Sequence, residues 1–288
     1  MYERFYGLNS RPFALNPDPA FLYPSRQHSM ALTLLEYGIE SHAAFGLLTG
    51  EIGSGKTTLL RHLIRGVADR AAVGLISNTH SGFTSIHRWA CSALEIVPAD
   101  DSDVALYEAL VDSFIRVYGR GRRTLLIVDE AQNLSVEVLE ELRLLSNVNS
   151  ERDVVLQILL VGQPELRATL SSPALRQLAQ RMSVDFHLRP LAASETGAYI
   201  EHRVVAAGGR AGLFGAGARE LVHRVSGGVP RLINQLCDMA LVYGYASGAH
   251  EIDAVLLEQV LADRLDAGAL PVLAGVARAD GVATHAGG

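Results

Sequence analysis

A glycine-rich stretch carries the residue types that bind phosphate. Residues 50–57 read G-x-x-x-x-G-K-T, with a short apolar run before them and a helical pattern after them. Between a strand and a helix, such glycines allow successive backbone N–H groups to point inward, and the helix N-terminus adds partial positive charge. The stretch therefore predicts a phosphate-binding loop, or P-loop. Its candidate nucleotide-binding residues are Gly50, Glu51, Ile52, Gly53, Ser54, Gly55, Lys56, Thr57 and Thr58.

Two side chains of this loop have distinct expected roles. Lys56 is expected to reach the β- and γ-phosphates of ATP, and the Thr57 hydroxyl to hold Mg²⁺. Of the 25 Lys and Arg residues in the chain, only Lys56 is a lysine. A compact ammonium on a thin stem fits inside a phosphate loop, whereas a planar guanidinium does not.

A pair of carboxylates further along the chain could complete the chemistry. The apolar run 124–128 ends in Asp129 and Glu130, which is a Walker B pattern. Parallel sheets bind ligands at the carboxyl ends of their strands. Asp129 is therefore predicted to hold Mg²⁺ together with Thr57, and Glu130 to orient or deprotonate the attacking water. By itself a strand that ends in two carboxylates also fits a solvated loop; the P-loop upstream favours the catalytic interpretation.

Hydrophobic periodicity predicts the elements that position these residues. Helical patterns alternate with five apolar runs, which predict strands over 44–49, 71–77, 124–128, 154–161 and 183–188. This alternation predicts an α/β fold with a five-stranded parallel sheet. The predicted helices of this part are 26–41, 58–64, 83–95, 103–118, 134–148 and 173–182. Beyond residue 190 only helices are predicted, over 194–207, 216–226, 230–246 and 253–265.

These patterns predict three parts in the chain. The first is a nucleotide-binding domain over 1–190, which includes an N-terminal arm rich in proline and aromatic residues. The arm is expected to wrap the core of this domain, and its aromatic residues to pack there or to contact a nucleobase. A smaller helical domain is expected over 191–266, followed by a flexible tail over 267–288. The helix predicted over 26–41 has the apolar residues Met30, Leu34, Leu35 and Ile39 on one face.

Composition excludes several classes of protein. The chain has 288 residues and a net charge of −6, so no overall charge attracts it to nucleic acid or to an anionic membrane. Its 10 histidines and two cysteines show no zinc-ligand spacing. No apolar run approaches the ~20 residues that span a bilayer, and no signal peptide is evident. We expect a cytoplasmic protein in which Cys91 and Cys237 are buried thiols.

Taken together, these features resemble the AAA+ ATPases, a P-loop NTPase family with a three-layer α/β domain and a helical lid. The aromatic and proline pattern of residues 5–23, the V-D-E-A-Q-N-L stretch at 128–134 and the G-Q-P-E-L stretch at 162–166 are similar to the ExeA branch. This branch comprises general secretion pathway protein A and related ATPases of pilus and exopolysaccharide loci. The resemblance covers roughly residues 1–265.

The resemblance implies roles for four further residues. Gln163, at the end of the fourth predicted strand, resembles sensor 1 and would contact the γ-phosphate or the attacking water. Arg231, directly after Pro230, resembles sensor 2, which binds nucleotide from the lid. Arg181 or Arg176 is implied as an arginine finger that acts on the ATP of a neighbouring subunit, and Arg181 is preferred because it lies just before the fifth strand. Each of these arginines could instead be an ordinary surface residue.

The resemblance further implies a Mg²⁺-dependent ATPase that forms a homo-oligomer and remodels or assembles a partner complex in an envelope secretion, pilus or exopolysaccharide system. Secretion-type members carry a membrane span and a cell-wall-binding module after the ATPase. This chain ends in a short tail instead, so we expect a stand-alone soluble member without a membrane span of its own.

Two alternatives stay open. One is a DNA-binding AAA+ regulator of transposition-type target selection. Its phosphate contacts would come from a basic cluster that also fits a solvated loop, formed by Arg116, Arg120, Arg122 and Arg123. The other is a nucleotide-switched scaffold with negligible hydrolysis, against which the Glu130 carboxylate argues.

Overall fold

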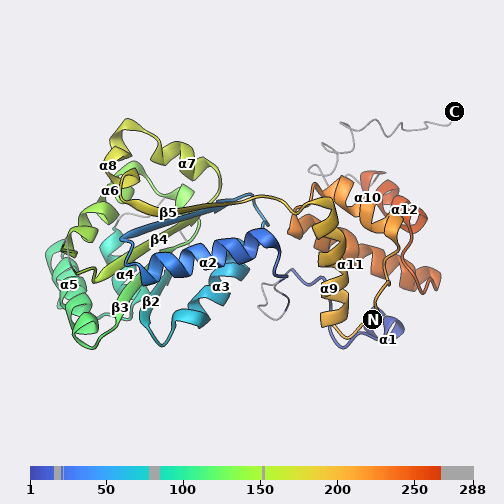
Figure 1. Ribbon diagram of the computed structural model, residues 1–288, viewed down its shortest axis with the longest axis horizontal. Helices are drawn as coiled ribbons and strands as arrows, with labels where there is room; N and C mark the ends of the chain where they lie inside the picture. Colours follow the sequence, from blue (N-terminus) through green and yellow to red (C-terminus); the bar gives the residue numbers. More distant parts are fainter. Residues whose placement is uncertain (16–20, 22, 78–84, 151–152, 267–288) are drawn as a thin grey trace. The chain divides into compact units, whose positions relative to one another are not determined.

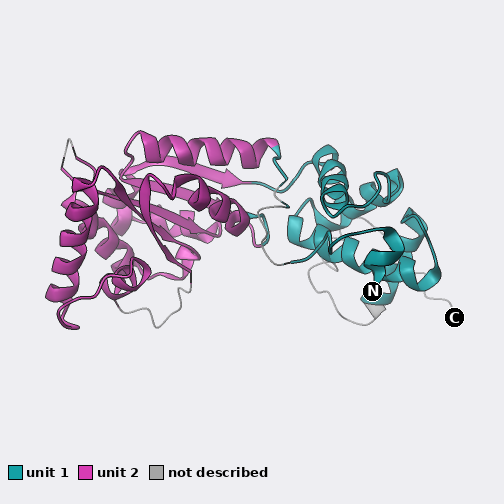
Figure 2. Ribbon diagram, turned by 90° about the horizontal axis from the view of Figure 1, so that it is seen from below, with its two compact units in different colours: residues 1–25, 53–55, 189–288 teal, residues 26–52, 56–188 magenta. Residues whose placement is uncertain are grey.

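The computed structural model describes residues 1–15, 21, 23–77, 85–150 and 153–266. The chain divides into two compact units, shown in teal and magenta in Figure 2. Unit 2 comprises residues 26–52 and 56–188, and unit 1 comprises residues 1–25, 53–55 and 189–288. The tail predicted over 267–288 lies outside the described residues.

Unit 2 contains the predicted five-stranded parallel sheet, with the strand order β2-β3-β4-β1-β5 (Figure 1). The strands are β1 (Phe45–Gly50), β2 (Ala71–Ile76), β3 (Arg123–Val128), β4 (Leu156–Gly162) and β5 (Met182–Leu188). Each falls within a residue or two of a predicted apolar run. These runs lack a strict alternation of apolar and polar residues because helices cover both faces of the sheet.

Helices on the two faces of this sheet give unit 2 its three layers. They are α2 (Arg26–Glu40), α3 (Lys56–Val67), α4 (Ile86–Ala93), α5 (Asp103–Gly119), α6 (Val136–Leu145), α7 (Glu165–Leu170) and α8 (Arg176–Ala179). Alternate residues of β3 pack in two different hydrophobic cores, one on each face of the sheet. Leu126 and Val128 pack with α4 to α8, whereas Leu125 and Ile127 pack with α2 and α3. The three-layer α/β fold is therefore confirmed.

Local differences from the prediction have identifiable causes. Helix α6 begins after Ser135, whose hydroxyl accepts a hydrogen bond from the Val138 N–H at 3.4 Å, and so starts later than predicted. Helix α7 was not predicted, because it is only six residues long. Of the predicted apolar face of α2, Leu34, Leu35 and Ile39 pack in the core, whereas Met30 is 48% exposed. The buried face of α2 also includes Gly38, where an added Cβ would lie 2.7 Å from Val184 of β5.

Unit 1 is helical, as the pattern beyond residue 190 predicted. Its helices are α1 (Tyr2–Tyr6), α9 (Ala193–Ala206), α10 (Ala216–Ser226), α11 (Pro230–Ser247) and α12 (Ala254–Asp266). The described residues of the N-terminal arm group with these helices, and not with the nucleotide-binding domain as we expected. Tyr6 and Phe13 are buried in the helical core, where Phe13 packs edge-on against Phe214 at 5.6 Å.

A buried arginine holds the arm in this unit. Arg203 of α9 donates hydrogen bonds to the carbonyls of Pro12 and, at 3.3 Å, Ala14. Its guanidinium also lies 5.0 Å from the ring centroid of Phe21 and 5.6 Å from that of Tyr199. Carbonyl acceptors and aromatic faces are suitable partners for a buried guanidinium. The aromatic residues of the arm thus complete the core of a small helical unit.

Candidate functional site

The glycine-rich loop lies between β1 and α3, as its sequence context predicted. Strand β1 ends at Gly50, and α3 begins at Lys56. Gly53 and Gly55 have φ angles of 79° and 98°, in the left-handed region that disfavours residues with a Cβ. These two positions therefore require glycine for the loop to turn back towards the helix N-terminus.

The ammonium group of Lys56 points back into this loop. Its Nζ donates hydrogen bonds to the carbonyls of Gly50 at 2.6 Å and Glu51 at 3.0 Å. Burial lowers the pKa of the Lys56 ammonium, an effect that the nearby Glu130 and Asp129 carboxylates oppose. An ammonium held only by backbone carbonyls can exchange them for phosphate oxygens, which form stronger, charge-assisted hydrogen bonds.

Asp129 and Thr57 meet at the carboxyl end of β3. The Asp129 N–H donates to the Ile76 carbonyl at 2.8 Å, which continues the β2–β3 pairing by one residue. Its carboxylate accepts a hydrogen bond from the Glu130 N–H at 2.9 Å and is hydrogen-bonded to the side chain of Thr57. The structure thus brings together the two residues predicted to hold Mg²⁺.

The oxygen donors of this pair suit a hard cation such as Mg²⁺. Burial raises the pKa of the Asp129 carboxyl above its ordinary value, and the Glu130 N–H opposes this effect. A buried carboxylate that is costly to ionise gains most when a cation binds beside it. In the part of the chain described, no three His, Cys, Asp or Glu residues cluster as metal ligands. Nucleotide and water would have to supply the remaining ligands.

Replacing Asp129 by Asn is expected to stabilise the nucleotide-free protein at neutral pH. A carboxyl whose pKa is raised by folding contributes stability below its unfolded pKa, and this contribution is lost as pH rises through the folded pKa. At pH 7 the ionised Asp129 therefore destabilises the wild-type protein. In urea unfolding, the midpoint of Asp129→Asn should exceed that of wild type at pH 7, and the difference should vanish towards the ordinary carboxyl pKa of 3.8.

Asp112→Asn is the matched control for this experiment, because Asp112 is an exposed carboxylate on α5. It should leave the midpoint near that of wild type throughout the pH range. A lower midpoint for Asp129→Asn than for wild type at pH 7 would contradict a desolvated carboxylate.

Glu130 is oriented by two side-chain amides. Its Oε2 accepts hydrogen bonds from Gln132 Nε2 at 2.6 Å and Gln163 Nε2 at 3.3 Å. The Gln132 Oε1 in turn accepts from the Gln163 N–H at 3.0 Å. Glu130 has a φ of 54°, a strained conformation for a residue with a Cβ. Together with Gly162, these residues form what we call the Glu130 cluster.

Gln132 was not assigned a role from the sequence. Its position two residues after Glu130, in the short turn Ala131–Asn133, allows its amide to fold back onto the carboxylate. Space for it exists because residue 162 is glycine: an added Cβ there would lie 2.7 Å from Gln132 Oε1. Two features of the sequence could have indicated this contact. Gln132 comes two residues after the Walker B glutamate, and the next strand ends in glycine.

The two candidate arginine fingers differ in their surroundings. Arg181 donates hydrogen bonds to the Ser146 hydroxyl at 2.7 Å and the Arg143 carbonyl at 3.5 Å, so it is held against α6 of its own chain. Arg176, at the start of α8, is exposed, and no described residue accepts a hydrogen bond from its guanidinium. An exposed Arg176 can reach a neighbouring subunit, but which of the two arginines acts as the finger stays a prediction.

Arg231 lies in the first turn of α11, after Pro230 at the N1 position. Its backbone N–H donates to the Gly53 carbonyl at 3.2 Å, and both residues group in unit 1. An added Cβ at Gly53 would lie 2.4 Å from the Arg231 Cβ, so this contact also requires glycine. The sensor 2 role of Arg231 stays a prediction.

Much of the basic cluster before β3 is engaged within the chain. Arg122 donates to the carbonyls of Ala68 at 2.8 Å and Ala71 at 2.6 Å. Arg123 donates to the Val154 carbonyl at 3.2 Å and lies 3.0 Å from His42 Nε2. These two guanidinium groups hold the ends of neighbouring strands, so they give little support to a DNA-binding role.

Comparisons with known proteins agree with the fold and the loop. Residues 39–170 match a family model described as AAA domain. The chain is 39% identical over 253 residues to general secretion pathway protein A of Aeromonas hydrophila. The match covers 88% of this chain and 46% of that protein, so the chain spans about half the length of this relative.

Solved structures with 25% identity or less show similarity of fold alone. The ADP form of the Aeropyrum pernix ORC2 protein has a TM-score of 0.65 and 19% identity, covering 90% of this chain and 74% of that one. The Thermotoga maritima RuvB Holliday junction branch migration motor has a TM-score of 0.52 and 19% identity, covering 82% and 67%. None of the described helices is both long and apolar enough to span a membrane.

Proposed function

Because this chain belongs to the AAA+ ATPase family and is related to general secretion pathway protein A, we propose that it hydrolyses ATP with Mg²⁺ and acts as a homo-oligomer on a partner complex. The observation that carries the proposal is the hydrogen-bonded pair of Thr57 and Asp129, with the Lys56 ammonium and the Glu130 carboxylate nearby. We further propose that it acts in the cytoplasm, where ATP and Mg²⁺ are supplied.

Each residue has a defined task in this proposal. Backbone N–H groups of the loop and the Lys56 ammonium bind the β- and γ-phosphates. Thr57 and Asp129 would hold Mg²⁺, which when bound offsets the charge of the phosphates. Glu130 accepts a proton from the attacking water, and the amides of Gln132 and Gln163 fix the direction of its carboxylate.

Hydrolysis itself is tested by phosphate release from ATP by the purified chain, with Mg²⁺ and with excess EDTA. We expect turnover only with Mg²⁺. Turnover that is equal in EDTA would contradict the assignment of Thr57 and Asp129, and a protein that binds ATP without any turnover would favour a nucleotide-switched scaffold.

We propose Arg176 as the arginine finger that acts in trans. An arginine supplied by a neighbouring subunit stabilises charge on the transferring phosphoryl group. Arg176→Ala and Lys56→Ala should each be inactive alone. Mixing them should restore part of the turnover, because an intact finger can then face an intact loop. Phosphate release from the mixture over a range of ratios measures this.

Arg181→Ala is the comparison variant, since Arg181 is held by Ser146 of its own chain. If mixing Arg181→Ala with Lys56→Ala restores turnover, and mixing Arg176→Ala with Lys56→Ala does not, then Arg181 is the arginine finger and Arg176 is not. If no mixture regains turnover at any concentration, the trans arrangement is wrong.

For the partner we propose a protein of an envelope secretion or related export system, since the curated relative is named for a secretion pathway. One of the similar structures, the Aeropyrum pernix ORC1 protein, was solved in complex with DNA. It has 16% identity and a TM-score of 0.64, and the match covers 89% of this chain and 69% of that one. Turnover measured against protein concentration, with and without duplex DNA, separates the two functions. We expect turnover per subunit to rise with concentration and to be unaffected by DNA.

A further inference from the structure

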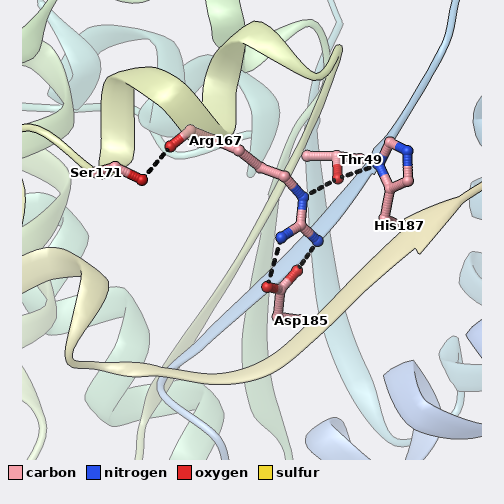
Figure 3. A network of polar contacts seen from close by, with 5 residues as sticks. All are labelled: Thr49, Arg167, Ser171, Asp185 and His187. Carbon is pink, nitrogen blue, oxygen red and sulfur yellow. Dashed lines mark hydrogen bonds and ion pairs between the residues drawn. The ribbon is translucent and has the colours of Figure 1, made fainter.

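A polar network lies directly before the phosphate-binding loop (Figure 3). Strands β1 and β5 pair in parallel with Thr49 opposite His187, and Asp185 comes two residues before His187. Because side chains alternate along a strand, Thr49, Asp185 and His187 project from the same face of the sheet. That face is covered by helices α4 to α8.

A single guanidinium group connects α7 to both strands. Arg167 of α7 donates from Nε to the Thr49 hydroxyl at 2.7 Å, and its two terminal nitrogens bind the two carboxylate oxygens of Asp185, one of them at 2.8 Å. The Thr49 hydroxyl lies 3.0 Å from His187 Nδ1 on its other side. Figure 3 shows the terminal nitrogens of Arg167 facing Asp185 while its Nε points to Thr49. The rigid fork of an arginine fixes direction as well as distance.

The Thr49 bond determines the geometry more than the ion pair does. The side chains of Arg167 and Asp185 are 36% and 43% exposed, so water screens their attraction. Thr49 is fully buried, at 0% exposure, and water cannot replace a lost partner there. The end of β1 is therefore held to α7 through one hydroxyl group.

We call the hydrogen bond between Arg167 and Thr49 the link, and both of its ends adjoin the candidate active site. Thr49 immediately precedes Gly50, whose carbonyl accepts from Lys56. At the other end, α7 follows Gln163 and Pro164, and the Arg167 N–H donates to the Pro164 carbonyl at 3.0 Å. Gln163 in turn donates to the Glu130 carboxylate. Strand pairing places Thr49 opposite Gly162 of the Glu130 cluster, and the Arg167–Thr49 bond adds a side-chain contact between the same two segments.

We propose that Arg167 is a positioning residue, which acts through Thr49 to hold the Glu130 cluster at a fixed distance from the phosphate-binding loop. The inference rests on the proposed ATPase function. Neither residue touches nucleotide in this role; each sets where the water-activating carboxylate stands relative to the γ-phosphate. Loss of the link should therefore slow the chemical step and leave ATP binding intact.

Three variants test the link. Thr49→Val keeps the shape of the side chain and removes the hydroxyl, Thr49→Ser keeps the hydroxyl, and Arg167→Ala removes the guanidinium. We expect Thr49→Val and Arg167→Ala to lower kcat by about tenfold or more, because small misplacements of reacting groups are costly. KM for ATP should change by less than about twofold, as for an interaction that matters only in the transition state.

The hydroxyl and the guanidinium should act as one unit. Thr49→Ser should have nearly wild-type kcat, and the Thr49→Val/Arg167→Ala double variant should be no slower than Arg167→Ala alone. An unchanged kcat in Thr49→Val overturns the proposal, as does an equal loss in Thr49→Ser, which would indicate packing instead of a hydrogen bond. Fully additive losses in the double variant also overturn it.

Amide hydrogen exchange provides a readout that does not require catalysis. Thr49→Val should exchange faster than Thr49→Ser both at residues 49–51 and at residues 163–170, because the link joins these segments. Equal exchange in the two variants overturns the link. If the wild-type chain binds ATP and does not hydrolyse it, the proposed function fails, and exchange alone still decides whether the link exists.

Discussion

Replacing Glu130 by Gln is expected to lower the rate of ATP hydrolysis by about 10²–10⁴-fold, the usual contribution of a general base. The amide keeps the size of the side chain and can still accept from Gln132 and Gln163, so the cluster should stay in place. What is lost is the negative charge that takes the proton of the attacking water. Phosphate release measures turnover, and titration with a fluorescent ATP analogue should show nearly unchanged affinity.

The control for this variant is Glu108→Gln. Glu108 is an exposed carboxylate on α5, and its replacement makes the same chemical change away from the loop. It should leave turnover at the wild-type value. Wild-type turnover in Glu130→Gln would remove this residue from the mechanism, and loss of ATP binding in that variant would show that the carboxylate has a structural role.

Replacing Lys56 by Ala is expected to weaken ATP binding by about tenfold to a hundredfold. Hydrogen bonds to charged groups contribute about 1.5–3 kcal/mol, and about 1.4 kcal/mol corresponds to a factor of ten in affinity. Lys56→Arg should not restore binding, because a planar guanidinium cannot take the place of Nζ between the carbonyls of Gly50 and Glu51. Calorimetric titration with ATP and Mg²⁺ measures the ATP affinity of the wild-type, Lys56→Ala and Lys56→Arg proteins.

The composition of the chain gives a second measurement of Lys56 without mutation. Lys56 is the only lysine, so an amine-directed reagent modifies one side chain besides the N-terminal amine. Burial lowers the pKa of its ammonium, which increases the reactive neutral fraction at a given pH. Bound ATP should protect Lys56 and leave the N-terminus reactive. Equal modification of Lys56 with and without ATP would contradict its contact with phosphate.

Several parts of the fold were predictable because they depend on residues close together in sequence. The helix predicted from residue 103 begins there in the structure, where the Ser102 hydroxyl accepts from the Ala105 N–H at 3.2 Å. Short apolar runs predicted the strands for the same reason, since runs that alternate with helical patterns are typical of a parallel sheet. On the predicted apolar face of α2 only Met30 is exposed, because burial depends on which side of the helix the sheet covers.

The N-terminal arm shows the limit of this reasoning. Its prolines and aromatic residues correctly indicated that the arm packs against a core. Nothing near them in the sequence specifies which core that is. Arg203, far along the chain, supplies the carbonyl and aromatic contacts that hold the arm in the helical unit. An aromatic side chain is buried equally well in any apolar core, so only the tertiary structure selects one.

By itself, the sequence determined the chemistry of the loop: which residues can bind phosphate and which carboxylates follow, because a local motif fixes the backbone and the side chains within a few residues. The tertiary structure decided how those groups are held. Gln132 reaches Glu130 because residue 162 is glycine, and Arg167 reaches Thr49 because β4, β1 and β5 lie side by side. Such contacts join segments that are far apart in the sequence, and the sequence separation of two segments does not determine their distance in the fold.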